Sequence, residues 1–142
     1  MDETEYRQVL ATSISRHCPF EKSILTSCAA CSLAVKHNVA EREVVACSDE
    51  TSYELCAALR DALRHNFTFA LGKLQIDGPL PHAQEMLVQC GGLRGLQFTL
   101  DGSGKVCDVA ALVLQAQQMY VSMADYPYSK IVQLAKAHYK SR

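Results

Sequence analysis

Residues 18–56 read CPFEKSILTSCAACSLAVKHNVAEREVVACSDETSYELC, and this stretch holds five of the seven cysteines of the chain. The five are Cys18, Cys28, Cys31, Cys47 and Cys56. Thiols gathered in this way in a reducing compartment indicate a soft metal or an iron-sulfur cluster, because such a centre deprotonates the sulfurs and holds them together. We therefore expect the first half of the chain to fold around a bound inorganic group.

The spacing of these cysteines favours a cluster over a single zinc ion. Only Cys28 and Cys31 form a short C-x2-C pair, whereas zinc sites usually contain two short pairs. A cluster is larger than one ion, so its ligands can come from segments that are far apart in the sequence. Cys18 precedes a proline, which is also typical of cluster ligands. The pattern predicts an iron-sulfur cluster, 4Fe-4S first of all, with zinc as the alternative.

Four of the five cysteines are expected to bind the cluster. Our first set is Cys18, Cys31, Cys47 and Cys56, with Cys28 as the alternative to one of them. The two lone cysteines, Cys90 and Cys107, are expected to be small buried apolar side chains.

Charged and imidazole side chains near the cysteines are candidates for a supporting role. Arg60 and Arg64 follow Cys56 by one and two helical turns, where they could neutralise an anionic cluster; the alternative is that both are ordinary solvated residues. His17 and His37 could replace a cysteine or donate to a sulfur, although a surface histidine is more common.

A family resemblance points the same way. The residues CPFEK at 18–22, AERE at 40–43 and the pair Cys47-x8-Cys56 resemble a group of small cysteine-rich, iron-sulfur-like bacterial proteins. The resemblance covers the first half of the chain. It implies a cluster-binding set of cysteines and no particular activity.

The apolar residues recur at helical spacing through nearly the whole chain, which predicts an all-α fold. We expect a single domain over 1–142, a bundle of about five to six helices with a cysteine-bearing half (1–72) and a packing half (73–142). The stretch 96–100 is expected to be irregular. The first expected helix ends near residue 16, and a short second helix opens at Pro19. A long helix begins within 48–52 and ends at Gly72, and the next opens at Pro81 and ends or bends at 91–92. The last two run from 106 to 123 and after Pro127.

Composition excludes several classes of protein. The 14 basic and 15 acidic residues leave no basic surface for nucleic acid. The amino terminus MDETEYRQ lacks an apolar signal region, and the apolar run at 109–114 is too short for a membrane span. We therefore expect a cytoplasmic protein, in which a framework of disulfides is the less expected use of seven cysteines.

Catalytic motifs are missing from the sequence. It contains no G-x-S-x-G, no phosphate-binding loop and no H-E-x-x-H. The C-x2-C pair in a helical chain is similar to that of the alkylhydroperoxidase D family, but His37 and Glu21 stand at the wrong spacings for its proton relay. We expect no catalytic residues and an iron-sulfur protein that carries or senses electrons with a redox partner protein. The alternatives are a zinc-stabilised interaction module and a C-x2-C thiol enzyme, and the apolar last helices suggest a homodimer.

Overall fold

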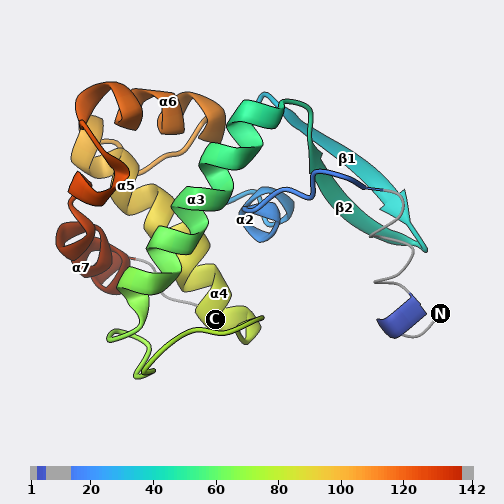
Figure 1. Cartoon of the computed structure of the whole chain (residues 1–142), viewed down its shortest axis with the longest axis horizontal. Coiled ribbons are helices and arrows are strands. Elements are labelled where there is room, and N and C mark those ends of the chain that lie inside the picture. The colour runs from blue at the N-terminus through green and yellow to red at the C-terminus, as the bar shows by residue number, and fades with distance from the viewer. Residues whose placement is uncertain (1–2, 6–13, 139–142) are drawn as a thin grey trace.

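The computed structural model describes residues 3–5 and 14–138 of the chain. A two-stranded hairpin lies at one end of a body of helices, and α2 and the start of α3 lie between the hairpin and that body (Figure 1). The helix expected up to residue 16 falls mainly on residues 6–13, outside the described residues. The elements are α2 (Glu21–Leu25), β1 (Ala34–Val39), β2 (Arg42–Cys47), α3 (Glu50–Phe67), α4 (His82–Met86), the π-helix η1 (Leu87–Gly91), α5 (Gly92–Asp101), α6 (Val109–Met119), the 3-10 helix η2 (Met123–Asp125) and α7 (Tyr128–His138).

The hairpin shows that the prediction of an all-α fold was wrong, since the described chain mixes helices with a sheet. Strands β1 and β2 pair antiparallel from Ala34 opposite Cys47 to Val39 opposite Arg42. Ala40 and Glu41 form the turn with φ of 51° and 66°, the left-handed conformation of a two-residue hairpin. These two residues are not the usual Asn-Gly or Asp-Gly of such turns, so no turn signal marked the hairpin between segments of helical periodicity.

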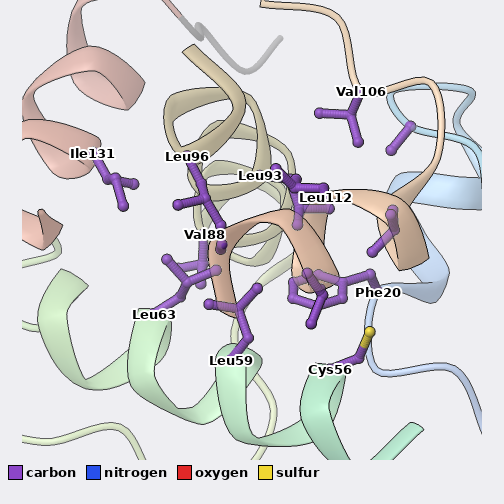
Figure 2. Packing of buried hydrophobic residues seen from close by; sticks show 14 of the residues in the cluster. Phe20, Cys56, Leu59, Leu63, Val88, Leu93, Leu96, Val106, Leu112 and Ile131 are labelled. Carbon is purple, nitrogen blue, oxygen red and sulfur yellow. The ribbon is translucent and has the colours of Figure 1, made fainter. Parts of the chain in front are cut away.

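Helix α3 begins and packs as its sequence predicts. The side chain of Asp49 caps the helix by accepting a hydrogen bond from the amide of Ser52 at 2.8 Å. Leu59 and Leu63 are buried on the same side of the helix as Cys56, which lies in its second turn (Figure 2). The helix ends at Phe67, five residues before the expected end at Gly72. This stripe carries Cys56 into the core.

The segment from α4 to α5 is helical without a break, in contrast to the irregular stretch predicted at 96–100. The glycines at 91–92 do not end it. Instead, the lack of a side chain lets neighbouring helices come close: a Cβ on Gly92 would lie 2.9 Å from Leu63 Cδ1 of α3. On Gly95 it would lie 2.9 Å from the backbone oxygen of Ile131 in α7. Close packing between helices therefore explains these glycines better than helix termination does.

The last helices complete the core. Helix α6 is shorter than the predicted 106–123 and begins at Val109, where Asp108 is the N-cap and accepts from the amide of Ala110 at 3.1 Å. Side chains from α3, η1, α5, α6 and α7 meet in one apolar cluster (Figure 2). Among the described residues, none of the helices combines the length and apolar character needed to cross a membrane. The largest fully buried side chains are Phe20, Phe67, Leu59, Leu63, Leu93, Leu96, Leu112, Ile131, Val44, Val45, Val88 and Cys90.

Candidate functional site: four cysteines around one cavity

Four cysteines from separate segments line one small cavity of about 20 Å³. Cys18 precedes α2, Cys31 follows it, Cys47 ends β2 and Cys56 lies in α3. All four are free thiols. They are the four residues of the first predicted ligand set. The rest of the wall is mainly apolar and comprises Pro19, Phe20, Ile24, Leu33, Ala34, Ala46, Ser52, Val109 and Ala110.

Backbone pairing with β2 holds Cys18 and Cys47 in place. The amide of Cys18 donates to the carbonyl of Val45 at 2.8 Å, and the amide of Cys47 donates to the carbonyl of Arg16 at 2.8 Å. His17 forms an isolated antiparallel bridge with Ala46 between these two bonds. The chain before α2 is thus fixed along β2, so Cys18 and Cys47 are positioned by paired backbone and not by loose loops.

Cys31 is held against the start of α6. The amide of Ala30 donates to the carbonyl of Val106 at 3.2 Å, and the amide of Val109 donates back to the carbonyl of Ala30 at 2.8 Å. On the other side of Cys31, the amide of Ser32 donates to Asp108 Oδ1 at 3.0 Å. The loop that carries Cys31 is therefore attached to α6 on both sides of the thiol.

Asp108 is well suited to this anchoring role. Burial acts to raise its pKa, but the hydrogen bonds that it accepts from Ser32 and from the amides of Ala110 and Ala111 outweigh that effect and lower the pKa below its ordinary value. The side chain is consequently a carboxylate at neutral pH. It caps α6 and binds the cysteine loop with the same charged group.

Backbone amides point at two of the sulfurs. The sulfur of Cys18 accepts from the amide of Phe20, and the sulfur of Cys31 accepts from the amides of Leu33 and Ala110. Such bonds favour the thiolate over the thiol, and they are the usual surroundings of sulfur ligands in metal centres. Ala110 also lies in the first turn of α6, whose positive dipole end favours a negative sulfur.

The cavity nevertheless opposes ionisation of its thiols. Burial first of all, together with the neighbouring cysteines, raises the pKa of Cys18 to about 11 and that of Cys56 to about 12. Burial also raises the pKa of Cys31, where Asp108 and Cys47 add to the effect. These thiols are therefore protonated at neutral pH unless a cationic centre takes the place of the protons.

Within residues 3–5 and 14–138, no group of three or more His, Cys, Asp or Glu side chains could hold one metal ion. Four sulfurs bound to one zinc at about 2.3 Å must lie within about 4 Å of each other. The four cysteine sulfurs would therefore have to move before they could bind one zinc ion or the irons of a cluster.

Cys28, the predicted alternative ligand, has a different partner. It forms a disulfide with Cys90, with their Cα atoms 6.1 Å apart, and so has no free thiolate to offer. Cys90 is buried as predicted, with 1% of its surface exposed, but it is not a simple apolar side chain. The prediction that Cys107 is buried was wrong, because it lies exposed in the turn before α6. The two bonded cysteines are separated by 62 residues, a pairing that spacing does not reveal.

Arg60 and Arg64 do not line the cysteine cavity. Arg64 forms an ion pair with Glu85 at 3.1 Å and donates to the carbonyl of Gly78, and Arg60 pairs with Asp61 at 3.2 Å. Along α3, the 1.5 Å rise per residue places Arg64 about 12 Å beyond Cys56. Both arginines instead line a separate cleft with Ile76, Gly78 and Pro79. The structure gives Arg64 a bonding partner on α4 and does not bring either arginine to the cysteine cavity.

The two predicted histidines, His17 and His37, lie outside the cysteine cavity. His17 Nε2 lies 2.5 Å from Glu21 Oε2, which in turn accepts from the amide of Val45 at 2.8 Å. His37 is exposed on β1 opposite Val44. Neither lines the cysteine cavity. Thiols are thus the ionisable side chains that surround the cavity.

The sequence did not reveal the contribution of the second half of the chain to this site. Asp108 and Ala110 belong to the predicted packing half, yet Asp108 accepts from the amide of Ser32 beside Cys31, and Ala110 lines the cavity. The signal was present: Asp108 is a typical N-cap residue before an apolar helix. Its link to residue 32 depends on the tertiary fold.

Comparison of the chain with protein-family models, with curated proteins and with solved structures finds no match. The function is therefore inferred from the residues that line the cysteine cavity.

Proposed function

We propose that Cys18, Cys31, Cys47 and Cys56 bind a 4Fe-4S cluster and that the protein transfers single electrons or senses redox state in the cytoplasm. One observation carries this proposal: four free cysteines from four separate segments line one cavity with a mainly apolar wall. A 4Fe-4S cluster takes four thiolates, and ligands from distant segments suit its size.

The surroundings of the sulfurs support the same proposal. The amides of Phe20, Leu33 and Ala110 donate to Cys18 and Cys31, and such bonds stabilise thiolates bound to iron. The raised pKa values of Cys18 and Cys56 mean that these sulfurs need a positive centre in order to ionise. Iron would supply that charge, and binding would release protons.

The side chains must rearrange for the cluster to enter. The cavity has room for about one water molecule, so the cysteines would have to turn about χ1 to surround a larger group. Cys47 would also have to break a hydrogen bond, since its thiol donates to the carbonyl of Asp49 at 3.2 Å. Cys31 and Cys47 are half-buried, which gives the cluster a side that faces solvent.

Four protein ligands suggest the type of chemistry. A cluster bound by four thiolates has no iron position open to a substrate, and electron transfer or sensing then fits better than substrate activation. A redox partner protein would exchange electrons at the side of the site where Cys31 and Cys47 approach the surface.

The proposal is tested on protein purified without oxygen, or reconstituted with ferrous iron and sulfide. We expect a brown protein with a broad visible charge-transfer absorption, iron and acid-labile sulfide in equal amounts, and an electron paramagnetic resonance signal after one-electron reduction. A colourless protein that holds one zinc ion would replace the proposal with a zinc-stabilised interaction module. A protein that binds neither iron nor zinc would overturn both.

A further inference from the structure

The Cys28–Cys90 disulfide lies beside a cleft of about 810 Å³ that the proposed cluster site does not explain. Three basic side chains line this cleft, Lys36, Arg94 and Lys105, and none of its lining residues is acidic. We call it the basic cleft. Its lining also includes Cys28 and two free thiols, the half-buried Cys31 and the exposed Cys107.

The two sulfurs of the disulfide differ in access. Cys28 is half-buried and lines the basic cleft, whereas Cys90 has 1% of its surface exposed and does not line it. An attacking thiolate can therefore reach the sulfur of Cys28 and not that of Cys90. Access to one sulfur only is the arrangement that thiol–disulfide exchange requires, because it decides which bond forms first.

Charge around Cys28 favours the same reaction. Ala29 and Val106 form a parallel bridge, which sets Lys105 beside Cys28 in the paired segments. Lys36 and Arg94 add two more positive charges to the lining of the same cleft. Cationic neighbours stabilise the thiolate of a cysteine, so they make Cys28 a better leaving group and a better nucleophile near neutral pH.

The position of Cys90 gives the site a second unusual feature. Cys90 lies in the π-helix η1, Leu87–Gly91, between α4 and α5. Short π-helical segments inside α-helices are frequent at functional sites, since they alter the direction of a side chain. Here the segment presents Cys90 to Cys28 from the buried side.

We propose that Cys28 and Cys90 form a redox-active pair that exchanges electrons with the cysteine pair of a partner polypeptide carrying acidic residues next to its reactive cysteine. This activity is separate from the proposed cluster and does not depend on it. It also differs from a Cys28–Cys31 redox pair, because Cys28 is bonded to Cys90, while Cys31 is a free thiol that lines both the cysteine cavity and the basic cleft.

The exchange balances without a further reactant. A partner thiolate attacks the sulfur of Cys28, the bond to Cys90 breaks, and Cys90 leaves with the electron pair and takes up a proton. The second partner thiolate then attacks the partner's own sulfur in the mixed disulfide and releases Cys28. The protein gains a dithiol, the partner gains a disulfide, and the reverse sequence reduces a partner disulfide.

The test uses the full chain with Cys107→Ser, so that the exposed free thiol does not react. The probes are glutathione, which is anionic, and cysteamine, which is cationic, and the reduced cysteines are trapped by alkylation and located by peptide mass spectrometry. We expect reduced glutathione to reduce the Cys28–Cys90 bond of the folded protein. In a Cys90→Ser variant, oxidised glutathione should exchange with the free thiol of Cys28, leaving one glutathione bound to Cys28 and releasing one reduced glutathione. In a Cys28→Ser variant, Cys90 should stay unmodified until denaturant is added.

A charge variant makes the test specific to the basic cleft. Replacing both lysines, Lys36→Gln with Lys105→Gln, should slow the reaction with glutathione about 10-fold and leave or increase the rate with cysteamine. The proposal is overturned if the disulfide resists reduction until the protein unfolds, if the adduct forms on Cys90, or if the charge variant reacts with glutathione as fast as the parent does.

Iron and sulfide measured in the same samples separate this inference from the proposed function. Exchange at Cys28 in a protein that binds no iron would overturn the cluster and leave the exchange site standing. A full cluster in a protein whose Cys28–Cys90 bond resists both thiols would do the opposite.

Discussion

Asp108 Oδ1, at the start of α6, accepts a hydrogen bond from the amide of Ser32 at 3.0 Å, next to Cys31 in the sequence. On the other side of Cys31, the carbonyl of Ala30 accepts from the amide of Val109 at 2.8 Å. The start of α6 is therefore part of the cysteine site. A division into a cysteine-bearing half and a separate packing half does not describe this molecule at its candidate site.

Replacing a cavity cysteine should remove the bound iron. We expect Cys56→Ser or Cys47→Ser to lose most of the iron and sulfide, because a hydroxyl is a poor ligand for a cluster that needs four thiolates. Iron, sulfide and visible absorption, measured per chain after reconstitution, check this. Cys107→Ser is the matched control, since Cys107 is a free cysteine that does not line the cavity. Equal iron loss in the control would contradict the ligand assignment.

The metal-free protein should lose stability as the pH rises above about 9. The thiols of Cys18 and Cys56 have pKa values of about 11 and about 12, above their ordinary value of 9.0. Their contribution to the free energy of unfolding is complete below the ordinary value. It falls at higher pH, because the unfolded chain releases these protons first. Each thiol lowers the free energy of unfolding by at most about 1.4 kcal/mol per pH unit in that range.

Urea unfolding under reducing conditions at about pH 8 and about pH 10 measures this pH dependence. Cys56→Ala should show a smaller decrease in the free energy of unfolding than the parent chain. The range stops at about pH 10 because burial raises the pKa of Tyr128 to about 12, so that this tyrosine adds its own decrease at higher pH. A decrease of the same size in parent and variant would show that Cys56 is not the titrating group.

Removing the Asp108 carboxylate should loosen Cys31. In Asp108→Ala, α6 loses its N-cap and the amide of Ser32 loses its acceptor, which costs about 1–2 kcal/mol of folding free energy. Chemical denaturation measures the loss, and iron should also leave the reconstituted variant faster when a chelator is added. Asp61→Ala is the control, because Asp61 forms an exposed ion pair with Arg60, and such pairs contribute little. A smaller loss in Asp108→Ala than in Asp61→Ala would argue against the anchoring role.

A methyl group on Gly95 should force α5 away from α7. Its Cβ would lie 2.9 Å from the carbonyl oxygen of Ile131, and backbone cannot move aside as a flexible side chain can. We expect Gly95→Ala to lower the free energy of unfolding by about 1–3 kcal/mol. Gly104→Ala is the control, since no atom lies within 4 Å of its Cβ position, and its effect should be within about 1 kcal/mol. Thermal or urea unfolding of the two variants side by side decides the point.

Some features of this protein follow from local sequence alone. Asp49 caps α3, and the stripe through Leu59 and Leu63 buries one side of that helix. The same stripe carries Cys56 inward. The short helix predicted to open at Pro19 begins two residues later, at Glu21. Local patterns of this kind determine an element because hydrogen bonds and apolar spacing act over a few residues.

Only the tertiary structure decided the pairing of distant segments. The hairpin of β1 and β2 was missed because its Ala40–Glu41 turn lacks the usual residues, and the Cys28–Cys90 bond joins cysteines separated by 62 residues. Contacts of this kind bond Cys28 to Cys90, so that Cys28 is not a free thiol. They also attach the Cys31 loop to α6. The sequence determined which residues can act as thiol ligands. The fold determined which of them meet, because contacts between distant segments depend on how the whole core packs.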